Sequence, residues 1–191
     1  MSELSLGTLS GLAANSYVID VAAGSSLDLS AGAVLPTGSI LQVVSTTKTD
    51  TFTTTTTSLT DITGLSATIT PRSTSSKIII LVHTASSYVP SGSSGGMLSI
   101  FRDGTNLSNP ASSGVREKVF TGFDQRTTNQ AMVSTSATYS DSPASTSTLT
   151  YSVKVRSQAG GTIYINRSVT DADNTATARA VSTITLMEVA G

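Results

Sequence analysis

The chain has 191 residues, enough for one domain or for one domain with an arm, since domains usually contain about 100 to 200 residues. Ser and Thr account for 33 and 32 residues and charged residues for only 12%, which disfavours a helical bundle because Ser and Thr compete for the hydrogen bonds of a helix backbone. A net charge of −1 excludes the basic surface that nucleic-acid binding requires, and the lack of Cys excludes disulfides, thiolate catalysis and Cys-ligated zinc.

Residues 1–38 are predicted to form an extended N-terminal arm. The segment is too small to bury a core alone, but it has too many aliphatic residues for a solvated linker. We expect it to pack against other chains or a larger assembly; the alternative is a flexible tail. The residues expected to make these attachment contacts are Leu4, Leu6, Leu9, Leu12, Tyr17, Val18, Ile19, Leu27 and Leu29.

The N-terminus does not show the pattern of an export signal, because the first basic residue is Lys48. The longest apolar run, Ile78–Val82, is far shorter than the ~20 apolar residues of a membrane helix. We therefore expect a protein that is made in a cytosol and does not insert into a membrane.

From Ile40 onward the sequence predicts short strands separated by turns, with no helical segment between them. Lys77–Thr84 contains the apolar run and is typical of a strand buried on both faces. Asp103-Gly104 predicts a hairpin turn. The expected strands are Ile40–Val44, Asp50–Thr57, Leu59–Thr70, Lys77–Thr84, Met97–Arg102, Val115–Thr121, Ala131–Ser140, Thr148–Arg156, Thr162–Asn166 and Ala178–Val189.

The clearest strand is Leu149–Arg156, in which apolar or aromatic residues alternate strictly with polar ones. Apolar residues with a period of two indicate a strand with one face buried and the other exposed to solvent. The next strand, Thr162–Asn166, follows after only five residues, so the two are predicted to form a hairpin. Closely spaced strands of this kind indicate an antiparallel sandwich or barrel.

The edge strands of such a sheet have unpaired backbone groups that can pair with other chains, and monomers usually prevent this pairing with charged residues or Pro at the edge. This chain has little of either. We therefore predict a homo-oligomer with closed symmetry, in which identical copies cover one another's edges.

Four segments resemble a module of tail-fibre-like and other virion structural proteins of tailed bacteriophages, particularly marine and cyanobacterial ones. The segments are Ile40–Val82, "YSDSPASTSTLTYSVKVRS" (Tyr139–Ser157), "GTIYINRS" (Gly161–Ser168) and "STITLMEVAG" (Ser182–Gly191). The resemblance implies a trimeric β-sandwich head on the exterior of a virion, made in the host bacterial cytoplasm. Residues 39–191 are accordingly expected to form an all-β, antiparallel, jelly-roll-like sandwich.

The candidate chemical sites also have simpler structural explanations. His83 is more easily explained as a structural hydrogen-bonding group than as a ligand or base. Asp171, Asp173 and Asn174 offer closely spaced oxygens for Ca²⁺, but they lack the spacing of an EF-hand, so a turn is the preferred interpretation. We expect no metal, no cofactor and no catalytic residues.

Loops are the natural candidates for receptor contact, because binding residues concentrate on them. An aromatic ring with nearby hydroxyls and amides suits a sugar, although for any single loop the preferred interpretation is a surface that merely tolerates sequence change. The candidate contact residues are Tyr88, Ser91, Ser93, Asn106, Asn109, Asp171, Asp173 and Asn174.

Two functions are compatible with these observations. The first is a short trimeric fibre or tail-tip knob, attached by its arm to a tail or adaptor protein, whose loops contact a glycan on the host surface. The second is a capsid decoration or cement protein whose arm lies on the major capsid protein. The absence of an acid–base pair or phosphate loop in the sequence argues against an enzyme.

Overall fold

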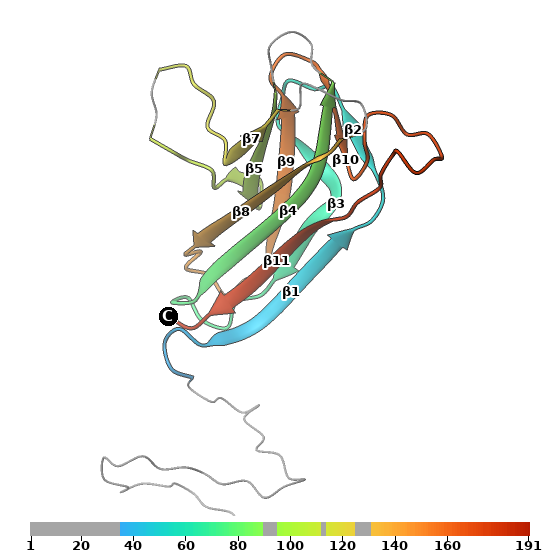
Figure 1. The fold of residues 1–191 in the computed structure, drawn as a ribbon. Coiled ribbons are helices and arrows are strands. Elements are labelled where there is room, and N and C mark those ends of the chain that lie inside the picture. Colours follow the sequence, from blue (N-terminus) through green and yellow to red (C-terminus); the bar gives the residue numbers. More distant parts are fainter. Residues whose placement is uncertain (1–34, 90–94, 112–113, 125–130) are drawn as a thin grey trace, which may run out of the picture. The chain divides into compact units, whose positions relative to one another are not determined.

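A computed structural model describes residues 35–89, 95–111, 114–124 and 131–191. The chain divides into two compact units, residues 1–34 and 35–191, and all described residues belong to the second. This described part contains strands and no helix (Figure 1). It therefore has no helix long and apolar enough to cross a membrane. The all-β prediction is confirmed.

The strands form two sheets in which every pairing is antiparallel. The first sheet contains β1 (Ile40–Lys48), β2 (Phe52–Thr54), β4 (Lys77–Val89), β8 (Val133–Asp141), β10 (Thr162–Ile165) and β11 (Ser182–Val189). The second contains β3 (Thr60–Ile69), β5 (Gly96–Arg102), β6 (Thr105–Asn106), β7 (Thr121–Phe123) and β9 (Leu149–Ser157).

Strand β4 is central to the first sheet because its 13 residues are long enough to pair with three neighbouring strands. It pairs with β8 along one side, and on the other side with β11 and then with β10. Strand β1 continues the sheet from β11, and β2 continues it from β10. Strands β1 and β8 therefore lie at opposite edges of the sheet.

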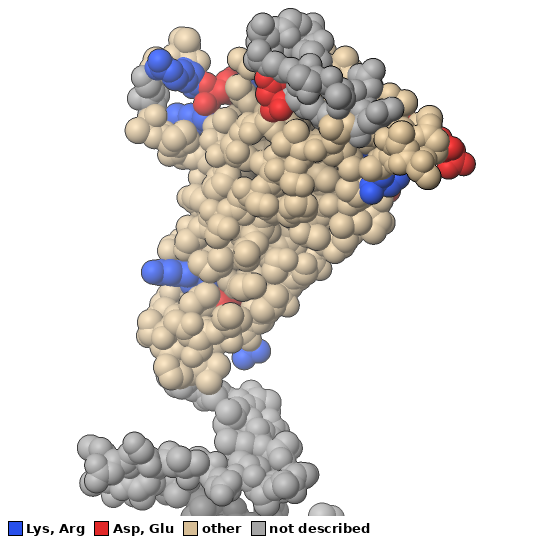
Figure 2. All heavy atoms as spheres, viewed as in Figure 1, with Lys and Arg blue, Asp and Glu red and all other residues tan. Residues whose placement is uncertain are grey.

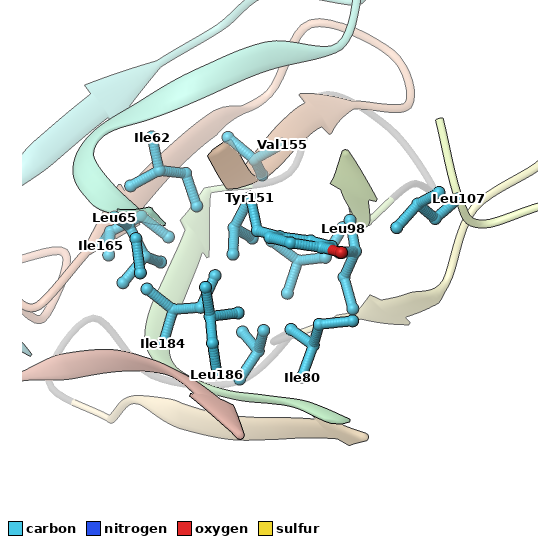
Figure 3. Close-up of a cluster of buried hydrophobic side chains, with 14 of the residues drawn as sticks. Ile62, Leu65, Ile80, Leu98, Leu107, Tyr151, Val155, Ile165, Ile184 and Leu186 are labelled. Carbon is cyan, nitrogen blue, oxygen red and sulfur yellow. The ribbon is translucent and has the colours of Figure 1, made fainter. Parts of the chain in front are cut away.

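Apolar side chains from both sheets meet in one core, as Figure 3 shows. Ile62 and Leu65 of β3 and Tyr151 of β9 face Ile80 of β4 and Ile184 of β11, and each is at most 2% exposed. Burying one such side chain stabilises a fold by roughly 1.5 to 3 kcal/mol. The two sheets thus pack face to face in a sandwich-like arrangement.

The alternation predicted for Leu149–Arg156 is confirmed in β9. Leu149, Tyr151, Val153 and Val155 are buried, and the residues between them point to the other side of the sheet. The turn at Asp103-Gly104 is also confirmed: it joins β5 to β6, and both residues have positive φ, 46° and 83°. Positive φ at both central residues is the geometry that favours Gly in a two-residue hairpin.

The predicted hairpin between Leu149–Arg156 and Thr162–Asn166 is wrong. Strand β9 belongs to the second sheet, where β3 and β5 occupy its two sides. No side is left for β10, which pairs instead with β4 and β2 in the first sheet. The short connection therefore crosses from one sheet to the other.

Two other strand predictions also need correction. The apolar run in β4 is not buried on both faces: Ile78 and Ile80 point into the core, but Leu81 on the opposite face is 37% exposed because none of the described strands covers that side. The strand expected at Val115–Thr121 is wrong over residues 115–120, which form no strand; β7, Thr121–Phe123, shares only Thr121 with it, and β6 and β7 pair with opposite ends of β5.

The predicted arm lies outside the described residues except for its last four. Gly38 donates its backbone N–H to the carbonyl of Ala190 at 2.8 Å, and Ala190 donates to the carbonyl of Ser39 at 2.9 Å. Gly38 and Ser39 are thus bound to Ala190, just after β11, and the predicted contact residues from Leu4 to Leu29 are not among those described.

Candidate functional site: the loop between β10 and β11

The loop from Asn166 to Val181 surrounds an open hollow of about 330 Å³. The loop begins at the end of β10 and returns to the sheet at the start of β11. It brings Asp171, Asp173 and Asn174, predicted as contact residues, around one hollow. The lining residues are Asp171, Ala172, Asp173, Asn174, Thr177, Ala178 and Arg179.

Two arginines share the carboxylate of Asp171 in this loop. Arg179 Nη2 lies 2.6 Å from Asp171 Oδ2, and Arg167 Nη1 lies 3.3 Å from the same atom. Arg167 is held further by hydrogen bonds to the carbonyls of Ser168 and Val169, and its guanidinium stacks 4.4 Å from the centre of the Tyr164 ring. Arg167 therefore anchors the loop, whereas Arg179, with 61% of its side chain exposed, faces the hollow and solvent.

Asn174 and Thr177 shape the other side of the hollow. The Oδ1 atom of Asn174 accepts a hydrogen bond from the backbone N–H of Ala176 at 2.9 Å, and the hydroxyl of Thr177 donates to the carbonyls of Ala172 and Asn174. This is the local side-chain-to-backbone bonding typical of a turn. The preferred interpretation of the segment as a turn agrees with this geometry, and no cluster of metal-binding side chains occurs among the described residues.

The hollow offers several kinds of polar group in a small space: carboxylates, an amide, a hydroxyl and a guanidinium. Arg179 donates one hydrogen bond to Asp171, while a guanidinium carries five N–H donors, so donors remain for a ligand. Such a surface can bind hydroxyl groups, and Arg can hold a carboxylate in a bidentate manner. The sequence analysis missed both arginines, although they flank "TDADNT" at a distance of only a few residues.

Tyr88 does not contact solvent, and its prediction as a sugar-stacking residue is wrong. Its side chain belongs to the core and is 2% exposed, because β4 extends to Val89 and turns the ring toward the second sheet. Ser91 and Ser93, from the same predicted loop, lie outside the described residues.

Asn106 and Asn109 lie in a different loop, where Lys118 links them. Asn106 Nδ2 donates to the carbonyl of Lys118 at 3.2 Å, and Lys118 Nζ donates to Asn109 Oδ1 at 2.8 Å. Their amides thus hold this loop together, so the structure favours a structural role for Asn106 over a contact role. Asn109 remains exposed.

His83 makes a contact of the kind expected for a structural hydrogen-bonding group. It lies on β4 with its side chain half-buried, and its Nδ1 atom is 3.2 Å from the hydroxyl of Ser136 on β8. No acidic residue is bound to it in any interaction that the structure shows.

No protein-family model matches this chain, and no curated protein matches it significantly. The resemblance to virion proteins therefore stays a prediction from the sequence.

Proposed function

We propose that this chain is a structural protein of a bacteriophage virion, a short trimeric fibre or tail-tip knob whose exposed loops contact a glycan on the host surface. The observation that supports this proposal is the hollow between β10 and β11, where three predicted contact residues meet Thr177 and Arg179. A glycan presents many hydroxyl groups, and these side chains are suited to bind them.

Oligomerisation is part of this proposal, because a small open hollow binds one sugar weakly. Several copies on one particle raise the overall avidity 10²- to 10⁴-fold when they engage the same surface. In the proposed arrangement the heads are jelly-roll-like and exposed on the virion exterior. Residues 1–38 then attach each head to a tail, adaptor or capsid protein.

Competition for adsorption tests the proposal directly. Purified full-length protein is expected to reduce the adsorption of the parent phage to host cells. The double variant Asn174→Ala, Arg179→Ala is expected to compete at least tenfold less well, whereas Thr68→Ala, an exposed position on β3, should compete like the native chain. Native protein that does not compete at any concentration would overturn the host-contact role.

Capsid decoration is the second candidate function. The observation that favours it is a largely uncharged sheet face, described below, which suits dense packing in a shell. Copy number separates the two: a fibre is present in a handful of copies per virion, and a decoration protein in dozens to hundreds. Gel densitometry of purified particles against the major capsid protein gives that number.

A further inference from the structure

The outer face of the first sheet is formed by the side chains that point away from the core. Alternation along each strand and the cross-strand register determine which residues these are. On this face lie Val43, Ser45 and Thr47 of β1, Thr183, Thr185, Met187 and Val189 of β11, Lys77, Ile79, Leu81 and His83 of β4, and Ser134, Ser136, Thr138 and Ser140 of β8.

This outer face is almost free of charge. Among the side chains that β1, β4, β8 and β11 place on this face, only Lys77, at the start of β4, and His83 can carry a charge; where β10 continues the face, Arg167 stacks on Tyr164. Figure 2 shows the side on which β1, β4, β8 and β11 lie; the middle of this view has no Lys, Arg, Asp or Glu, and the visible charged groups lie toward its sides and its upper and lower parts.

Aliphatic groups form the middle of the outer face. Val43, Met187 and Ile79 stand opposite one another on β1, β11 and β4, and Val43 is 54% exposed. In the next row, Thr185 separates Ser45 from the exposed Leu81. Side chains directly opposite in a sheet lie on the same face, so these rows form one continuous surface of aliphatic and hydroxyl groups.

The outer side of the second sheet is different. Asp61 pairs with Lys154 at 3.3 Å, and Glu117 pairs with Arg156. Lys154 also lies 4.5 Å from the centre of the Phe101 ring. The outer side of the second sheet thus carries ion pairs, which suit it to face water, whereas the outer side chains of β1, β4, β8 and β11 form no ion pair among the described residues.

The size of the outer face matches the needs of a protein interface. Four strands spaced about 4.8 Å apart, with about eight residues each at about 3.4 Å, cover roughly 500 Å². Two such faces in contact bury roughly 1,000 Å², the lower limit for a specific interface. Edge strands β1 and β8, both nine residues long, carry only the buried Lys48 and Asp141 as charges, so nothing repels a neighbour there.

We propose that the outer face of the first sheet is the surface through which copies of this chain associate. The occupant is a second copy, because an uncharged surface of hydroxyl and aliphatic groups complements itself and offers no charge pattern for a partner of another kind. A face that complements itself joins two copies about a twofold axis, so the inference rests on self-association within the proposed function and neither on its threefold symmetry nor on host contact.

Matched Thr→Lys substitutions on the two outer sides test this inference. Thr138 on β8 and Thr68 on β3 are both exposed strand residues, one on the outer face of the first sheet and one on the second sheet. The full chain is expected to sediment as a multimer, and Thr138→Lys should lower its mass toward the 19.5 kDa of one chain. Thr68→Lys should leave the mass unchanged.

Leu81→Lys, at the centre of the outer face, is expected to abolish association completely, and circular dichroism checks that each variant is folded. If Leu81→Lys does not fold, Thr138→Lys with Ser136→Lys takes its place. A native multimer that keeps its mass in these variants overturns the inference but leaves oligomerisation intact. A native chain that sediments as a single copy overturns both, and adsorption competition still tests host contact separately.

Discussion

Ser182 donates its hydroxyl hydrogen to Oδ1 of Asn166 at 2.6 Å, and both side chains are fully buried. The same serine oxygen accepts the backbone N–H of Ala85 on β4 at 3.3 Å. Asn166 Nδ2 donates to the carbonyls of Lys48 and Asp50 at 2.8 and 2.9 Å. One asparagine thus ties the ends of β1, β2, β10 and β11 together, at a residue with φ of 63°, a conformation that Asn tolerates better than most residues.

Asn166→Ala is expected to reduce the free energy of unfolding by about 2 to 4 kcal/mol, because it leaves buried carbonyls and the Ser182 hydroxyl without partners. Urea unfolding followed by circular dichroism measures the loss. Asn109→Ala, at an exposed asparagine, should change stability by about 0.5 kcal/mol or less. Equal effects of the two substitutions would contradict the role of Asn166.

Glu188 is expected to make stability depend on pH in the acid range. Its carboxylate is fully buried; burial raises its pKa, but hydrogen bonds from Gln42, Ser76 and the backbone of Arg72 outweigh burial and hold the pKa below its ordinary value of 4.5. A carboxyl whose folded pKa is lowered contributes stability above its unfolded pKa and loses it as the pH falls through the folded value.

Chemical unfolding between pH 7 and pH 3 therefore should show a decline in stability that is weaker in Glu188→Gln. At pH 7 this variant is expected to lose about 2 kcal/mol, because an amide nitrogen replaces an acceptor facing several donors. An identical pH slope in both proteins would show that Glu188 is not the group responsible.

Tyr151 is expected to make stability depend on pH in the alkaline range. Burial, and then the hydrogen bond that its hydroxyl donates to Asp141 at 2.7 Å, raise its pKa above the ordinary value of 10.0. The unfolded chain loses this proton at lower pH than the folded chain, so stability falls as the pH rises above about 10. Tyr151→Phe should remove that part of the decline, and chemical unfolding of both proteins at increasing alkaline pH measures it.

The two arginines of the β10–β11 loop are expected to differ in their effect on stability. Arg179→Ala removes an exposed ion pair and should cost about 0.5 kcal/mol or less. Arg167→Ala removes two hydrogen bonds to backbone carbonyls and the contact with Tyr164, and should cost about 2 kcal/mol. Thermal unfolding of both variants measures the difference, and a larger loss for Arg179→Ala would reverse the assigned roles.

Much of the fold could be predicted because its signals are local. The alternation in Leu149–Arg156 requires only that one side of a strand be buried, and the turn at Asp103-Gly104 depends on two neighbouring residues. In the candidate site, the turn at Asp171–Asn174 could likewise be predicted from neighbouring residues. The inward position of the Tyr88 side chain could not be predicted, because it depends on how far β4 continues and on which sheet faces it.

By itself, the sequence determined that the described chain forms strands, roughly where most of them lie, and which face of the clearest strand is buried, since these properties follow from residue type and a period of two. The tertiary structure alone decided that β9 and β10 belong to different sheets, that Asn166 and Glu188 lie buried with their hydrogen bonds satisfied, and that Asp61 and Lys154 form an ion pair on the outer side of the second sheet. Each of these properties depends on contacts between residues far apart in the chain, and such contacts cannot be predicted from the sequence pattern of a single strand or turn.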